Sequence, residues 1–235
     1  MSDFDNNDNN NDNNNDNDNN TEKSGKQMIQ EVVAILDRSG SMAGKEDDSI
    51  GGINTAIETL KSQRERDTII KVSIKLFDDR EDMLIRSLDI NEVRPIERRQ
   101  FVPRGTTALL DAIGKTLAYF MEKKLIDKTA YDSCIIYVVT DGYENASTTF
   151  TSKKIKNMIT NAENTYNIKL IYLAANQDAI LEATNLGIPS TQAMNYSENT
   201  ENVTCAYRSL ANMAKRCRSG DCSGFTQEER NDSYV

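Results

Sequence analysis

The chain has 235 residues, a formal net charge of −9 and 37% hydrophobic residues, enough apolar material for one α/β domain with a buried core. It has no histidine, which excludes a Ser-His-Asp or Cys-His nucleophile, an imidazole base and a histidine-ligated zinc site. The acidic balance argues against a nucleic-acid partner, and no apolar run reaches the roughly 18 residues that a membrane span requires.

The N-terminal segment 1–26 is a low-complexity tract rich in Asn and Asp, which lacks the apolar residues needed for a core. We therefore expect a disordered leader. No secretory signal is recognisable, so we expect a cytoplasmic protein without a membrane partner. The four cysteines are too few and too unevenly spaced for a disulfide framework, and we expect reduced thiols, with a soft-metal site as the lesser alternative: Cys134, Cys205, Cys217 and Cys222.

From residue 27, apolar runs alternate with amphipathic stretches. The continuous apolar run in 28–36 is typical of a parallel strand covered on both faces. After a loop, Ile50, Ile53, Ile57 and Leu60 recur at helical spacing and predict a helix over 48–63. Strands are predicted at 68–77 and 83–88. The turn between these strands is too short for a crossover, so they form an antiparallel hairpin.

The second half repeats the alternation. A charged connection over 93–104 leads into a helix that starts near Thr107. Strands follow at 133–140, 169–174 and 192–194, and helices at 152–164, 178–185 and 201–217, with Gly187 as a helix C-cap. This order predicts a doubly wound, Rossmann-like α/β fold: a mostly parallel six-stranded sheet with one antiparallel edge strand and helices on both faces. The domain covers 27–218, and 219–235 is predicted to be a flexible tail.

Three loops of this fold are expected to meet. In doubly wound sheets, ligands bind beyond the carboxyl ends of the strands, where the strand order reverses. The first strand and the strand 133–140 end at that point, and the helix near residue 107 starts beside it. These loops carry carboxylates and hydroxyls: Asp37, Ser39 and Ser41; Thr106 and Thr107; and Asp141.

The donors in these loops are all hard oxygens. Such donors suit Mg²⁺, Mn²⁺ or Ca²⁺ rather than zinc or copper. Mg²⁺ is the first expectation, and it usually keeps several waters, so the carboxylates can act directly or through water. Neutral hydroxyl ligands leave the ion electron-poor, which favours an anionic oxygen supplied from outside.

The motifs themselves resemble a known family. Asp37-Arg-Ser-Gly-Ser, the threonine at 107 and Thr140-Asp-Gly resemble the D-x-S-x-S, threonine and T-D-G elements of the metal-ion-dependent adhesion site of von Willebrand factor type A domains. The resemblance covers residues 28 to 215. The longer motif segments look like the compact single-domain members found in bacteria, bacteriophages and large DNA viruses.

The resemblance implies specific roles. Ser39, Ser41 and Thr107 would be direct ligands, Asp37 and Asp141 would bind largely through water, and a partner protein's Asp or Glu carboxylate would fill the open position. Alignment to the family pattern selects Thr107, with Thr106 in the place of a glycine.

Three functions remain open. The first is a metal-dependent protein-binding module that docks an acidic side chain of a partner and is not an enzyme. The alternatives are a metal-assisted phosphate or ester hydrolase and a structural or virion component with an incidental metal. Against the hydrolase, Ser39 stands where aspartyl-phosphate enzymes need a second carboxylate, and no P-loop motif occurs.

Several nearby polar residues have two readings. Glu144 and Asn145 would either contact a partner or cap the helix that starts at residue 152. Asp111 would anchor the loop of Thr107 or satisfy first-turn amides of its own helix. Asp78 and Asp79 are expected to shape the hairpin turn.

Overall fold

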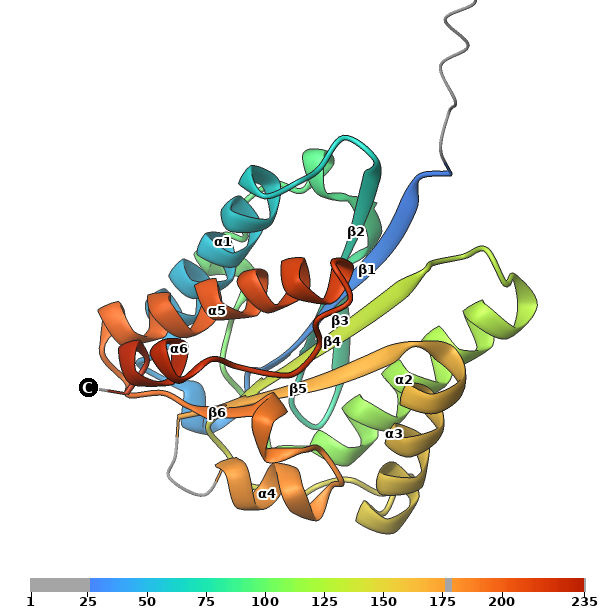
Figure 1. Cartoon of the computed structure of the whole chain (residues 1–235). Helices are drawn as coiled ribbons and strands as arrows, with labels where there is room; N and C mark the ends of the chain where they lie inside the picture. Colours follow the sequence, from blue (N-terminus) through green and yellow to red (C-terminus); the bar gives the residue numbers. More distant parts are fainter. Residues whose placement is uncertain (1–25, 176–178, 235) are drawn as a thin grey trace, which may run out of the picture.

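The computed structural model describes residues 26–175 and 179–234, which form a six-stranded sheet between helices (Figure 1). The strand order is β3-β2-β1-β4-β5-β6. Neighbouring strands are parallel except β2 and β3, which form the expected antiparallel hairpin at one edge. The predicted fold class is confirmed. The strands are β1 (Met28–Asp37), β2 (Thr68–Phe77), β3 (Glu81–Asp89), β4 (Ser133–Thr140), β5 (Ile168–Ala174) and β6 (Ala193–Asn195).

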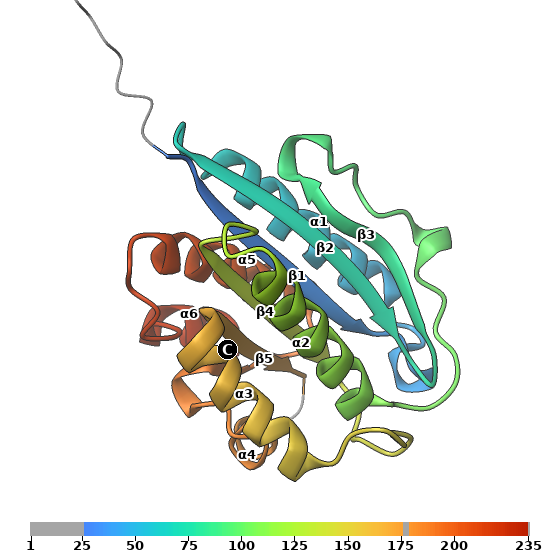
Figure 2. The same ribbon diagram turned by 90° about the vertical axis from the view of Figure 1, so that its right-hand side faces the viewer.

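The helices cover both faces of the sheet (Figure 2). One face carries α1 and α5 with α6 beside α5, and the opposite face carries α2 and α3, with α4 near the β6 edge. Their bounds are α1 (Glu46–Ser62), α2 (Leu109–Ile126), α3 (Ser152–Tyr166), α4 (Ala179–Asn185), α5 (Thr200–Arg218) and α6 (Gln227–Asp232).

The central strands β1 and β4 are almost continuously apolar because they are buried on both faces. Every residue of β4 is buried, and β1 is buried from Gln30 onward. Successive side chains of β1 enter opposite cores: Val32 belongs to the cluster under α1 and α5, and Val33 to the cluster under α2 and α3. A strand with a core on each side has no face on which polar residues are favourable.

The strand order reverses between β1 and β4. From β1 the chain crosses through α1 to β2 on one side, and from β4 it crosses through α3 to β5 on the other. The loops after β1 and β4 therefore both lie at the point of the carboxyl edge where doubly wound sheets bind ligands, and we call this point the crevice.

The second helix begins later than the pattern predicts. It starts at Leu109 rather than near Thr107. The backbone N–H of Thr107 donates instead to Asn145 Oδ1 at 2.9 Å, and that of Ala108 to the carbonyl of Asp78 at 3.0 Å. Thr107 is therefore a loop residue at the crevice.

The C-terminal segment is packed, which corrects the expectation of a flexible tail after residue 218. Phe225 is 7% exposed and Ser233 is fully buried. Arg216 of α5 forms two hydrogen bonds to Glu229 of α6, at 2.8 and 2.9 Å. Thr226 and Glu229 form a capping box that starts α6. Sequence periodicity missed this helix because it has only six residues and is held by tertiary contacts.

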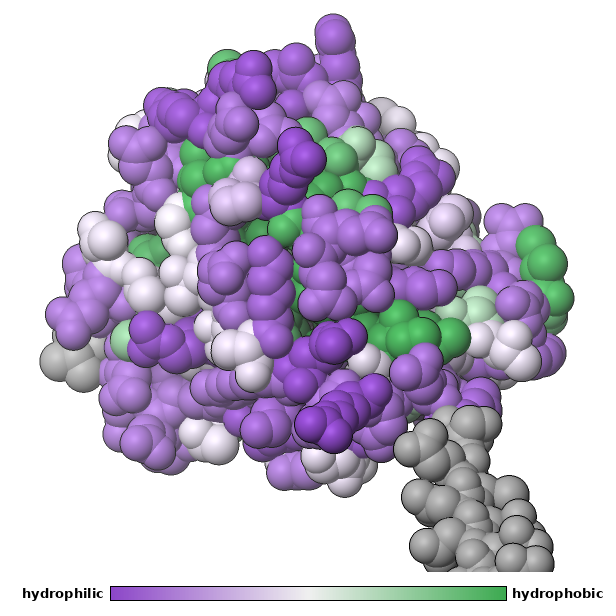
Figure 3. Space-filling view, turned by 90° about the horizontal axis from the view of Figure 1, so that it is seen from above, coloured by the Kyte–Doolittle hydropathy of each residue, from purple (hydrophilic) through white to green (hydrophobic). Residues whose placement is uncertain are grey.

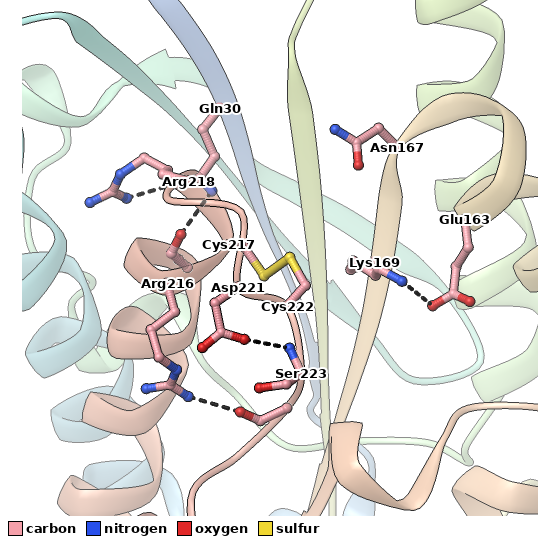
Figure 4. The surroundings of a disulfide bond; sticks show 12 residues. Gln30, Glu163, Asn167, Lys169, Arg216, Cys217, Arg218, Asp221, Cys222 and Ser223 are labelled. Atoms are coloured by element: carbon pink, nitrogen blue, oxygen red, sulfur yellow. Dashed lines mark hydrogen bonds and ion pairs between the residues drawn. A yellow bond between two sulfur atoms is a disulfide. The ribbon is translucent and has the colours of Figure 1, made fainter.

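The cysteines also differ in part from the expectation. Cys134 is a buried strand thiol as predicted, and Cys205 is free, but Cys217 and Cys222 form a disulfide (Figure 4). The turn after α5, with Gly220 at φ +88°, brings their Cα atoms to 4.6 Å. This bond excludes a metal site on these two sulfurs. The two cysteines are five residues apart, longer than the C-x-x-C spacing, so the sequence pattern does not indicate this bond.

The surface seen from above is largely hydrophilic, with apolar side chains visible toward its centre (Figure 3). Large exposed apolar side chains are distributed over separate elements, including Val102, Leu125 and Leu181. Among the described residues, no helix combines the length and apolar character needed to cross a membrane. The predicted leader lies almost entirely outside the described residues.

Candidate metal site

The last residue of β1 places a carboxylate beneath the crevice. Asp37 is 1% exposed; its Oδ1 accepts the N–H of Ser39 at 2.7 Å, and its Oδ2 accepts the hydroxyl of Thr140 at 2.6 Å. Burial raises the pKa of Asp37, and these hydrogen bonds offset the rise only in part. Within the described ranges no lysine or arginine forms an ion pair with it, so its negative charge is balanced by neutral donors alone.

The two serines of the following turn extend the polar surface. Ser39 is buried and Ser41 is exposed, and their Oγ atoms are 3.0 Å apart. Ser41 donates its hydroxyl to Asp141 Oδ1 at 2.7 Å, which links the loop after β1 to the loop after β4. The backbone N–H of Gly40 donates to the carbonyl of Gly105 at 3.2 Å and so ties the turn to the loop of Thr107.

Three of the predicted oxygens converge on one small space in front of Gly142. A methyl group built on Gly142 would lie 3.1 Å from Thr107 Oγ1, 3.3 Å from Ser41 Oγ and 3.5 Å from Asp37 Oδ2. Thr107 is 3% exposed and faces this space, whereas Thr106 is exposed. A side chain at position 142 would crowd these oxygens, and the space is a cradle of oxygens from the end of β1 with its turn and from the loop of Thr107.

The fourth element is Asp141, whose side chain is 3% exposed. Its Oδ1 accepts from Ser41, while its Oδ2 lies 2.6 Å from the ammonium of Lys45, which also lies 2.5 Å from Glu198 Oε1. Burial alone would lower the pKa of Lys45, but the two carboxylates outweigh burial and the pKa rises. Sequence reasoning missed Lys45 because its partner lies 96 residues away.

The loop after β4 is anchored by residues whose role the pattern left open. Glu144 accepts the N–H groups of Leu110, Ala146 and Ser147 at 2.7–3.0 Å, so it joins this loop to the first turn of α2. Thr151 caps α3 instead. Asn145 exchanges hydrogen bonds with the backbone of Thr107.

Asp111 holds the same loop from the helix side. Its carboxylate accepts the N–H groups of Thr148, Thr149 and Phe150 at 2.9–3.1 Å. Burial by itself would raise the pKa of Asp111, but these donors outweigh it and the pKa falls below its ordinary value. The loop bearing Asp141 is therefore fixed to α2 on the side where Thr107 enters.

Asp78 directly follows the neighbouring strand β2 and holds together the loops beside the site. It is fully buried and accepts from Arg38 Nε at 2.7 Å and Arg104 Nε at 2.9 Å. Its Oδ1 also accepts the N–H of Arg80 at 2.7 Å, which shapes the hairpin turn as expected. This carboxylate joins the loops after β1, after β2 and before α2.

The donor set of the site is therefore mixed. Within residues 26–175 and 179–234, no three carboxylates or thiols gather as a metal cage. What meets at the crevice is the hydroxyls of Ser39, Ser41 and Thr107 with the carboxylates of Asp37 and Asp141. These hard oxygens around a space that a single methyl would fill fit a small, oxygen-preferring divalent cation. The structure brings all five predicted residues together, and their metal ligation stays a prediction.

The fold of the chain is similar to that of known proteins, although its sequence is not. No protein-family model matches the chain, and no curated protein sequence matches it. Among solved structures, the von Willebrand factor domain of a type V pili tip protein from Porphyromonas gingivalis is 11% identical with TM-score 0.58, over 86% of this chain and 99% of that one. The chain has the fold of a von Willebrand factor type A domain.

Two further solved structures of this fold contain metal. The TRAP protein of Plasmodium vivax, loaded with manganese, is 18% identical with TM-score 0.51, over 74% of this chain and 70% of that one. Proximal thread matrix protein 1 from the mussel byssus, with a zinc-occupied adhesion-site motif, is 11% identical with TM-score 0.55, over 82% of this chain. This chain spans 47% of the mussel protein's chain.

Proposed function

We propose that the chain is a divalent-metal-dependent protein-binding module that takes an acidic side chain of a partner protein at the crevice. The observation that carries this proposal is the cradle in front of Gly142, where Thr107 Oγ1 from the loop before α2 lies near Ser41 Oγ and Asp37 Oδ2 from the end of β1 and its turn. Thr107 and the two serines would hold the ion, and Asp37 and Asp141 would supply negative charge directly or through water.

Mg²⁺ is the cation that we propose, with Mn²⁺ or Ca²⁺ as substitutes. The bound ion would supply an electron-poor centre that attracts an anionic oxygen. The chain's own residues favour a ligand from outside, because three of the five donors are neutral hydroxyls. Ser41 is exposed at the opening of the crevice, so a partner side chain has access to this point.

The hydrolase alternative finds less support in the residues around the crevice. The position two residues after Asp37 holds Ser39, whose neutral hydroxyl cannot replace the second carboxylate as a general acid and base. The only lysine in contact with the five residues, within the described part of the chain, is Lys45, and it is engaged by Asp141 and Glu198. We therefore propose binding rather than turnover.

Titration of the full chain with Mg²⁺ by calorimetry tests the ligand set. We expect Thr107→Ala to weaken Mg²⁺ affinity about 10- to 100-fold, as loss of a group that supports a metal does. Thr106→Ala is the matched control, because Thr106 is exposed, and it should leave the affinity unchanged. Equal affinity for the wild type and Thr107→Ala would contradict the assignment.

The partner is tested by capture from lysate in Mg²⁺ against EDTA, beside an assay with an aryl phosphate. Metal-dependent capture that Thr107→Ala abolishes, without turnover, supports the binding module. Turnover that is lost in Asp37→Ala would favour the hydrolase. Metal binding with neither activity would favour a structural component.

A further inference from the structure

A chain of charges runs outward from the proposed metal site. The hydroxyl of Ser41 donates to Asp141 Oδ1 at 2.7 Å, Lys45 binds Asp141 Oδ2 at 2.6 Å, and Glu198 binds the same ammonium at 2.5 Å. The side chains become more exposed along this path, from 3% for Asp141 to 31% for Lys45 and 48% for Glu198.

Lys45 opposes a cation at the cradle in two ways. Its positive charge repels a second cation held by the same carboxylate. It also engages Asp141, so that Oδ1 becomes a weaker acceptor and the oxygen of Ser41, which faces the cradle, becomes a poorer donor to a metal. Asp37 and Asp141 would neutralise a divalent ion by themselves, and Lys45 adds one net positive charge to that balance.

Glu198 offsets that charge from outside. It lies on the segment between β6 and α5, and with Lys45 it lines a cavity of about 200 Å³ beside the crevice. Asp48 lines the same cavity, but its carboxylate accepts the hydroxyl of Thr200 at 2.9 Å. Glu198 is therefore the outer carboxylate in contact with Lys45.

We propose that Lys45 and Glu198 set the affinity of the crevice for its divalent cation: Lys45 lowers it, and Glu198 restores part of it by acting through Lys45. This inference rests on the proposed metal-binding function. It assigns an affinity-determining role to two residues outside the ligand set and couples the segment after β6 to the occupancy of the site.

The test measures Mg²⁺ affinity of the full chain by calorimetry at low ionic strength. We expect Lys45→Gln to tighten binding about two- to fivefold, the size typical of partly exposed charge pairs. Glutamine keeps a donor for Asp141 Oδ2 while removing the charge. Glu198→Gln should weaken binding by a similar factor. At an ionic strength of about 1 M, where the Debye length is about 3 Å, both effects should shrink.

The double variant tests whether Glu198 acts through Lys45. In the Lys45→Gln background, Glu198→Gln should change the affinity by less than about half of its effect in the wild type on a logarithmic scale. An equal weakening in both backgrounds would show that Glu198 acts directly and would overturn the inference. The matched controls are Lys61→Gln and Glu58→Gln, a partly exposed ion pair near the C-terminal end of α1, and they should leave affinity unchanged.

The same measurements distinguish a failure of the proposed metal binding from a failure of the proposed role of Lys45. If the wild type takes up neither Mg²⁺ nor Mn²⁺, the proposed function fails and the inference fails with it. If the wild type binds Mg²⁺ but Lys45→Gln leaves the affinity unchanged or weakens it, the inference alone is wrong, because Lys45 then serves only to hold Asp141 in place. Thermal unfolding without metal checks that each variant is folded.

Discussion

Two carboxylates at the same edge of the sheet have opposite electrostatic surroundings. Asp37 ends β1 and Asp78 follows β2, the strand beside it, and neither side chain reaches solvent. Asp78 accepts hydrogen bonds from two guanidinium groups, whereas the donors to Asp37 among the described residues are neutral, a backbone N–H and hydroxyl groups. Similar sequence positions therefore produce one balanced charge and one unbalanced charge.

The pKa values follow this difference. Burial alone would raise the pKa of both groups. For Asp78, two guanidinium groups and the N–H of Arg80 outweigh burial, so its pKa lies below the ordinary value. For Asp37, burial prevails and the pKa rises. A buried carboxylate that lacks a cation inside the protein is the better candidate to attract one from solution, so Asp37 belongs to the binding site and Asp78 to its support.

Removal of Asp78, the carboxylate that two guanidinium groups neutralise, should have the greatest effect on stability. Asp78→Ala should lower the free energy of unfolding by about 3–5 kcal/mol, because it leaves the buried guanidinium of Arg38 without its fully buried carboxylate partner. Urea denaturation measures this loss. Asp79→Ala, at a side chain that is 47% exposed, is the control and should cost less than about 1 kcal/mol. A small loss for Asp78→Ala would mean that Arg38 is adequately served by Asp82.

Removal of the charge of Asp37, which no cation in the described protein neutralises, should mainly change the response to Mg²⁺. Asp37→Asn should change the free energy of unfolding without metal by less than about 1 kcal/mol, because it removes a costly buried charge and keeps a polar amide beside Ser39 and Thr140. Mg²⁺ at a hundred times its dissociation constant should stabilise the wild type by about 2.7 kcal/mol and leave this variant unaffected. Thermal unfolding with and without Mg²⁺ measures both. An equal response to Mg²⁺ would remove Asp37 from the site.

A third carboxylate, Asp111, is stabilised by backbone N–H donors, and its replacement should have a smaller effect on stability. Asp111→Asn should lower the free energy of unfolding at pH 7 by about 2 kcal/mol, because it removes a charged acceptor from three N–H groups. The folded pKa of Asp111 lies below the unfolded value of 3.8, so its contribution is complete above about pH 4 and is lost as pH falls through the folded pKa. The difference between variant and wild type should shrink accordingly.

Denaturation at pH 7 and pH 3 provides this measurement. Glu122→Gln, at an exposed acid of the same helix, is the control and should stay within about 0.5 kcal/mol of the wild type at both pH values. A deficit for Asp111→Asn that does not change with pH would show that hydrogen-bond geometry, and not charge, carries the contribution.

Much of the fold could be predicted because its signals are local. β2 and β4 have the predicted ends: β4 is an almost continuous apolar run with a core on each face, and β2 is an apolar-rich stretch that ends at the polar hairpin turn. The short turn before β3 excluded a parallel crossover. The helix α6 escaped prediction, since six residues carry no clear periodicity and their capping box and the pair between Arg216 and Glu229 become visible only in three dimensions.

The sequence by itself determined the identity of the donors and the edge of the sheet at which they stand, because each polar residue directly follows its strand along the chain and parallel strands end at the same edge. Tertiary structure alone decided how the charges pair. The ammonium of Lys45 meets Asp141 across 96 residues, and two arginines meet Asp78 rather than Asp37. Electrostatic energy depends on distance and burial, which spacing along a chain does not specify.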